Sequence, residues 1–305
     1  MNALRALSIL ALAALPAFGT AHAAGGDVKE YKTKDWHFSG PFGTYDQDAL
    51  QRGYQVYETV CSNCHGLDYL SFRNLGQKGG PFHLDECPAG VPDTINCSNP
   101  NDNPIVKSIA ENYKFKVMDG PDEFGDMFER TALPSDRFPG PFPNEQIARM
   151  ANNNALPPDL SLIIKARANG ADYVYSLLTG YVEPPSTVEI APGQYYNPYY
   201  PGDMSQALKP EYLDAEGKPQ KGVEVPYGGV LAMSQPLYDG VIDYPDDSTP
   251  ETVEQYSADV VEFLTWAAEP KMEQRKSLGV ATLIYLVILT GLLYWSYRKI
   301  WNDAK

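Results

Sequence analysis

The segment "VCSNCHG" at residues 60–66 holds the side chains with the clearest chemical potential in this sequence. Cys61 and Cys64 are separated by two residues, and His65 follows directly. Two thiols and an imidazole at this spacing could hold a metal ion, form a redox-active disulfide, or attach a haem covalently. The rest of the sequence has to discriminate among these three chemistries.

A structural zinc site is poorly supported, because such a site needs four ligands, usually in two closely spaced Cys/His pairs. The other two cysteines, Cys87 and Cys97, lack that spacing. After the first 23 residues the chain contains only three histidines, His37, His65 and His83. A thioredoxin-like redox motif would require a βαβ pattern around it, and none is visible.

Covalent attachment of haem fits the segment best. Cys61 and Cys64 lie about one helical turn apart, so both thiols can add to the two vinyl groups at one porphyrin edge. His65 then projects toward the iron from the same turn. C-x-x-C-H is the attachment signature of c-type haem, and the sequence therefore predicts one covalently bound haem c.

Two helices are predicted to position this segment. Ahead of it, Leu50, Tyr54, Tyr57 and Cys61 recur at helical spacing, with Thr44 and Asp46 as candidate N-caps. A second helix is expected late in the chain, with Thr249 as N-cap and Pro250 in its first turn. Its apolar stripe, which we interpret as core, consists of Val253, Tyr256, Val260, Phe263, Leu264 and Ala267.

The N-terminal segment predicts export. Residues 1–23 contain one positive charge, an apolar stretch and a terminal Ala-His-Ala, the order typical of a secretory signal peptide. We therefore expect a signal peptide at 1–23 and a periplasmic cytochrome domain at 24–276.

The C-terminal segment predicts a membrane anchor. Residues 278–297 are uncharged and would be about 30 Å long as a helix, which matches the apolar core of a bilayer. Tyr294, Trp295 and Tyr297 lie at its end, Trp301 lies just beyond, and Arg298 and Lys299 follow the run directly, as at a membrane boundary. We expect a single transmembrane helix at 277–297 in the inner membrane and a cytoplasmic tail at 298–305.

The charge balance bears on possible partners. The chain has 24 Lys and Arg residues against 39 Asp and Glu residues. Such an acidic protein is a poor partner for nucleic acid and a natural one for a basic protein. The stretch at 118–130, "MDGPDEFGDMFER", is an acidic segment that could steer the encounter with such a partner.

An ordered series of segments resembles cytochrome c1 of the alphaproteobacterial type. The series comprises "CSNCHGLDYLSFRNL", "FPGPFPNEQIARMANNNALPPDLS", the block "ALPPDLSLIIKARANGADYVYSLLTGYVEPP" at 155–185, "YYNPYYPG" and "FLTWAAEPKMEQRK". The resemblance runs from about Trp36 to Arg298. It implies a mostly helical, loop-rich c-type cytochrome domain with one C-terminal transmembrane helix.

The resemblance also implies a function and partners. Cytochrome c1 is the haem-bearing subunit of the quinol:cytochrome c oxidoreductase, the cytochrome bc1 complex, which is dimeric. In that family an electron passes from the Rieske iron–sulfur protein through the haem to a cytochrome c, and cytochrome b oxidises quinol. The chain would then have no substrate chemistry of its own. The alternatives are a membrane-anchored cytochrome c serving a terminal oxidase, a haem dehydrogenase subunit, or a peroxidase with a free sixth site.

The second axial ligand is less clear from the sequence. A thioether raises the reduction potential relative to a second imidazole, so methionine suits an acceptor from a Rieske centre. Met204 and Met233 both follow the "NPYYPG" segment, and His37 and His83 remain possible. We choose Met233, because it keeps the family's downstream register and makes residues 205–228 an inserted loop.

Three further expectations follow. Arg167 and Tyr173 match positions that contact a haem propionate in the family, and a buried propionate needs such a cation or donor. Cys87 and Cys97 enclose a Pro/Gly-containing loop, and in an oxidising compartment we expect them to form a disulfide. That bond would be local structure without a part in electron transfer.

Overall fold

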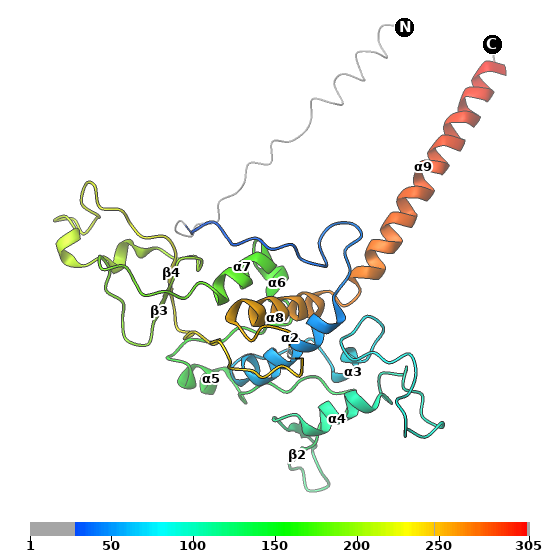
Figure 1. The fold of residues 1–305 in the computed structure, drawn as a ribbon, viewed down its shortest axis with the longest axis horizontal. Helices are drawn as coiled ribbons and strands as arrows, with labels where there is room; N and C mark the ends of the chain where they lie inside the picture. The colour runs from blue at the N-terminus through cyan, green and yellow to red at the C-terminus, as the bar shows by residue number, and fades with distance from the viewer. Residues whose placement is uncertain (1–27, 247, 304–305) are drawn as a thin grey trace.

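Helices α2 (Gln47–Thr59) and α8 (Val253–Ala268) pack against each other at the centre of the domain (Figure 1). The computed structural model describes residues 28–246 and 248–303, so the expected signal peptide lies outside the described residues. Gly53 allows the close approach of the two helices, since a Cβ there would lie 2.0 Å from the carbonyl oxygen of Asp259. The buried core is built around this pair.

Short helices, one hairpin and a second two-stranded sheet complete the domain. The strands β1 (Val117–Asp119) and β2 (Phe128–Arg130) pair antiparallel, as do β3 (Tyr195–Asn197) and β4 (Gly229–Leu231). The remaining helices are the 3-10 helix η1 (Cys61–Asn63), α3 (Phe72–Leu75), α4 (Pro104–Asn112), α5 (Glu145–Ala151), α6 (Ile163–Ala166), α7 (Gly170–Leu178), and the 3-10 helices η2 (Met204–Ala207) and η3 (Pro210–Tyr212). The expected mostly helical, loop-rich fold is confirmed.

Of the two candidate N-caps expected for α2, the structure uses Asp46 and not Thr44, and the expected start of α8 is wrong. Asp46 caps α2, and its carboxylate accepts from two backbone N–H groups of the first turn. The N-cap of α8 is Thr252, whereas we expected Thr249. The Thr249 hydroxyl instead donates to Asp246 at 2.9 Å, which ties it into the preceding turn. The helix therefore begins at Val253, beyond Pro250.

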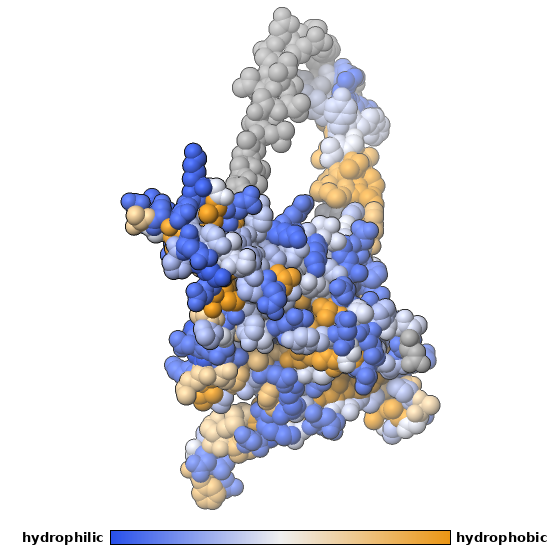
Figure 2. Space-filling view, turned by 60° about the vertical axis from the view of Figure 1, so that its left-hand side comes forward, coloured by the Kyte–Doolittle hydropathy of each residue, from blue (hydrophilic) through white to orange (hydrophobic). Residues whose placement is uncertain are grey.

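The C-terminal helix α9 (Met272–Asp303) leaves the domain alone (Figure 1). Within the described residues it is the one helix long and apolar enough to cross a membrane, and its apolar window is not buried in the protein. Figure 2 shows its apolar part as an orange band above the domain. The helix contains the expected span 277–297 and starts five residues earlier. The chain therefore has the membrane anchor that the sequence predicted.

The segment expected to be an inserted loop is folded. Residues 205–228 belong to the long connection between β3 and β4. They bring apolar side chains to a small cluster separate from the main core. Met204 begins η2 and is only 2% exposed in this cluster. Its buried neighbours are Val188, Tyr196 and Leu208.

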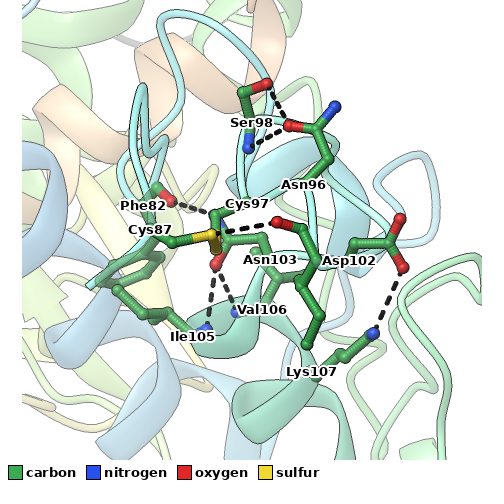
Figure 3. The surroundings of a disulfide bond; sticks show 11 residues. Phe82, Cys87, Asn96, Cys97, Ser98, Asp102, Asn103, Ile105, Val106 and Lys107 are labelled. Atoms are coloured by element: carbon green, nitrogen blue, oxygen red, sulfur yellow. Dashed lines mark hydrogen bonds and ion pairs between the residues drawn. A yellow bond between two sulfur atoms is a disulfide. The ribbon is translucent and has the colours of Figure 1, made fainter. Parts of the chain in front are cut away.

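The disulfide between Cys87 and Cys97 is present, as predicted (Figure 3). It closes a loop next to the N-terminus of α4. The Asn103 side chain caps that helix and also donates to the carbonyl oxygen of Phe82 at 2.8 Å. The disulfide and this amide together hold the loop against the core.

Candidate functional site

A largely apolar cavity of about 580 Å³ lies between the end of α2, the middle of α8 and the segments around them. Val60 and the C-x-x-C-H segment form one wall, and α8 contributes Val260 and Leu264. The cavity brings together all six residues that the sequence predicted for the site: Cys61, Cys64, His65, Arg167, Tyr173 and Met233.

The turn after α2 places the two thiols and the imidazole on the same wall. The backbone N–H groups of Cys64 and His65 both donate to the carbonyl oxygen of Cys61, at 3.1 and 2.9 Å. This tight turn is the 3-10 helix η1, which ends the α2 helix and turns its last residues into the cavity. The core stripe of α2 thus leads directly into the site.

A hydrogen bond through Nδ1 orients the His65 ring and leaves Nε2 available as a ligand. Its Nδ1 lies 2.7 Å from the carbonyl oxygen of Pro158, which can only accept, so Nδ1 carries the proton. The lone pair of the imidazole is then on Nε2, as in a ligand whose tautomer is fixed by its outer neighbour. Burial lowers the pKa of His65 and keeps the ring neutral. Tyr57 steadies the turn by donating to the His65 carbonyl at 3.1 Å.

The thiols do not have the properties of a redox pair. Burial raises the pKa of Cys61 to about 12, and burial also raises that of Cys64. Reactive dithiols and thiolate metal ligands require the opposite shift. Among the described residues there is also no group of three or more Cys, His, Asp or Glu side chains that could hold a metal ion. Among the described residues, neither a redox-active dithiol nor a closed Cys/His metal site is therefore supported at this turn.

Met233 is the methionine that lines the cavity. The Tyr181 hydroxyl donates to its backbone carbonyl at 3.0 Å and fixes the segment at this point. Met204 is enclosed in the separate cluster at the β3–β4 sheet. The other described methionines lie outside the lining: Met272 is in the main core, and Met118, Met127 and Met150 are exposed.

The alternative imidazoles also lie outside the lining. His37 is 60% exposed beside Asp46 and Glu262. His83 bonds to the carbonyl oxygen of Gly76, near the disulfide loop. Neither is placed to serve as a sixth ligand in this cavity.

Arg167 and Tyr173 lie at the side of the cavity formed by α6 and α7. Tyr173 is buried, and burial raises the pKa of its hydroxyl against the opposing effect of Arg167. Arg167 is solvent-exposed and uses Nη1 on the Ala166 carbonyl, which leaves the rest of its guanidinium fork available. A cation and a hydroxyl on this side could bind an acidic group at the cavity rim.

Sequence reasoning missed several contributors to the cavity. The carbonyl oxygen of Pro158 orients His65, yet a backbone group leaves no trace in residue type. Val260 and Leu264 were assigned to the core, although the same stripe also faces the cavity. The segment "LPPDLS", which contains Pro158, was noted only because it resembles the corresponding segment of cytochrome c1. Leu156, Tyr195, Tyr200 and Leu231 also line the cavity.

These residues fit a haem c. Two protonated thiols, a neutral imidazole with Nε2 free and a thioether face one apolar space, and a guanidinium stands at its side. The fold and the site together define a c-type cytochrome with a C-terminal membrane anchor.

Comparison with known proteins identifies the group to which this cytochrome belongs. The sequence model of the Cytochrome C1 family matches residues 36–304. Cytochrome b/c1 of Bradyrhizobium diazoefficiens is 42% identical over 288 residues, covering 88% of this chain and 35% of that longer protein. Mitochondrial cytochrome c1 heme protein of Saccharomyces cerevisiae is 41% identical, covering 88% and 72%. Cytochrome c1 of Rhodospirillum rubrum is 37% identical, covering 94% and 93%. The chain belongs to the cytochrome c1 family.

Family membership fixes the general role. Cytochrome c1 is the haem-bearing subunit of the bc1 complex, so this chain transfers electrons in the quinol:cytochrome c oxidoreductase. It carries one covalently bound haem c. Its partner subunits are cytochrome b and the Rieske protein. The apolar helix α9 anchors it in the membrane.

Proposed function

We propose that Cys61 and Cys64 form the thioether bonds to the haem and that His65 and Met233 are its axial ligands. The domain then receives an electron from the Rieske protein and passes it to a cytochrome c. The observation that carries this proposal is the lining of one cavity by all six predicted residues, with Met233 as its methionine.

The protein controls this transfer through the surroundings of the group. When bound, the haem supplies a one-electron couple of its iron. The Pro158 carbonyl orients His65, and the Met233 thioether favours a higher reduction potential than a second imidazole would. Apolar walls exclude water. Arg167 and Tyr173 bind a propionate and offset the cost of partly burying its charge.

The acceptor docks on an acidic face in this proposal. The β1–β2 hairpin projects from the domain on the side away from α9 (Figure 1). Arg130 neutralises Asp119 and Asp136, and the free acids Asp122, Glu123, Asp126 and Glu129 are exposed. None of the hairpin lines the cavity, so its charge would act on a basic cytochrome c from a distance, and salt would screen this effect.

The orientation in the cell follows from the segments at the two ends. The signal peptide at 1–23 exports the domain at 24–276 to the periplasm, and the tail at 298–305 stays in the cytoplasm. The complex is dimeric in this proposal, as the resemblance implies.

Covalent attachment is tested with the cysteine pair. Cys61→Ser combined with Cys64→Ser should abolish haem staining of the polypeptide after denaturing electrophoresis, because no thioether remains. The matched control is Cys87→Ser with Cys97→Ser, which removes the disulfide and should keep the stain. Haem that persists on the first double variant would contradict the assignment.

A further inference from the structure

A short loop at the base of α9 exposes a phenylalanine. Phe42 is 79% exposed, and residues 38–45 around it carry no charge. A single exposed apolar side chain needs no explanation by itself. The position of this one relative to the membrane anchor does.

Hydrogen bonds fix the loop to α9. The Lys276 ammonium donates to the carbonyl oxygens of Phe38 and Gly43, at 2.5 and 3.0 Å. The backbone N–H of Tyr45 donates to the Glu273 carboxylate at 2.8 Å. The two α9 side chains are three residues apart, so they hold the loop to one face of the helix.

The loop lies at the level where the apolar span begins. The uncharged run starts at Leu278, two residues after Lys276, which is about 3 Å along the helix axis. The headgroup layer on each side of a bilayer is roughly 5–7 Å thick. The carbonyls bound by Lys276 are therefore at headgroup depth. Figure 1 shows this loop beside the base of α9, on the side toward which the helix leaves the domain.

The turn itself is tight and holds its tip outward. Gly40 has φ +73°, a conformation that favours glycine. A Cβ at Gly43 would lie 2.1 Å from the carbonyl oxygen of Ser39. The loop therefore presents Phe42 on a compact and well-defined turn.

We infer that Phe42 inserts into the headgroup region of the bilayer, as a second attachment point of the periplasmic domain beside α9. Apolar aromatic side chains such as Phe can bury at the headgroup boundary, and the neighbouring exposed Lys271 suits anionic lipid headgroups, whereas Arg275 is paired with Glu269. A helix alone leaves a domain free to tilt. A second contact next to it limits that freedom and keeps the haem domain at a set inclination toward its partner subunits.

A nitroxide on Phe42→Cys tests the inference in the assembled complex, placed in vesicles of phosphatidylcholine and phosphatidylglycerol. In the proposed holoprotein all four native cysteines of this chain are covalently engaged, so the added thiol is the one of this chain that takes the label. The wild-type complex, labelled in the same way, supplies the background from partner subunits. Phe124→Cys, on the β1–β2 hairpin, is the matched control, because Phe124 is an equally exposed loop phenylalanine (86%). The ratio of collisions with oxygen to collisions with a water-soluble nickel complex should be severalfold higher at position 42.

Two outcomes would overturn the inference. Equal ratios at both positions would place Phe42 in water. A label at position 42 that neither reagent reaches would show that a partner subunit covers the loop. Covalent haem and an unchanged absorption spectrum establish that each labelled variant is folded, so every result bears on the inference. The labelling rests on the thioether bonds of the proposed function, which the haem stain of Cys61→Ser with Cys64→Ser tests separately. The collision ratio itself does not depend on the axial ligands.

Discussion

The segments at Met204 and Met233 share the sequence Met-Ser-Gln, but the two methionines lie in different surroundings. Met204 is enclosed among Val188, Tyr196 and Leu208, where its thioether fills space. Met233 faces a cavity that also receives the C-x-x-C-H segment. The difference lies entirely in what the remainder of the chain brings to each methionine.

If Met233 is the ligand, as proposed, a methionine that only fills a cluster can resemble a ligand in the sequence. Residues 205–228 lie between the two methionines. Their apolar side chains pack with those of the β3–β4 sheet in a separate cluster. The cluster needs a flexible apolar side chain at its centre, and methionine serves well there. A ligand must keep its sulfur uncovered by protein atoms. The two requirements select the same residue type for opposite reasons.

Met233→Leu should have the largest effect, because it removes the proposed ligand while roughly preserving volume. The haem should stay attached, its potential should fall, and the reduced protein should bind carbon monoxide. Quinol-driven reduction of cytochrome c should be lost. Redox titration and carbon monoxide difference spectra measure these changes.

The control for Met233→Leu is the same substitution in the other segment. Met204→Leu should leave the potential, the spectrum and the electron transfer near wild type. An exchange of the two phenotypes would make Met204 the ligand. If neither variant binds carbon monoxide, the ligand is not a methionine.

The elements that carry this comparison were predictable in part. The stripes of α2 and α8 identified both central helices, because helices that pack on a core repeat their apolar residues at a period near 3.6. The predicted start of α8 was wrong. Thr249 and Thr252 are equally good N-caps by residue type, but the Thr249 hydroxyl donates to Asp246, and Thr252 caps the helix. Local sequence does not contain that competition.

The site was predictable where side-chain chemistry defines it. The C-x-x-C-H segment, Arg167 and Tyr173 were predicted from motif and resemblance, and Met233 by register. All of them line the cavity, and their roles toward a haem stay predictions. The Pro158 carbonyl was missed, because a backbone acceptor depends on the path of the chain and on no residue type. The fold of residues 205–228 was missed for a related reason: a polar segment rich in Pro and Gly gives weak periodicity, although a few of its apolar residues form a cluster.

Met204→Ala should have the second largest effect, and it should appear in stability. Truncation of a buried methionine costs about 2–5 kcal/mol through lost transfer energy and the cavity left behind. The cluster is separate from the main core, so we expect local opening of residues 205–228. Limited proteolysis should cut this segment faster than in Met204→Leu, while the haem potential stays unchanged. A lowered potential in Met204→Ala would mean that the two segments are coupled.

Tyr181→Phe should have the smallest effect and sharpens the comparison further. The Tyr181 hydroxyl donates to the Met233 carbonyl at 3.0 Å, and burial raises its pKa, so it remains a donor at every working pH. Loss of this bond costs about 0.5–1.5 kcal/mol. If Met233 is a ligand, loss of this hydrogen bond should weaken the binding of its thioether to the iron. A small fraction of the protein should then bind carbon monoxide. The matched variant is Tyr196→Phe, which deletes the hydroxyl that donates to the Tyr227 carbonyl at 2.7 Å in the Met204 cluster. It should reduce stability by a similar amount and leave carbon monoxide binding undetectable, because its partner positions no ligand. Equal carbon monoxide binding in the two variants would mean that general loosening of the domain, rather than the position of Met233, opens the sixth site.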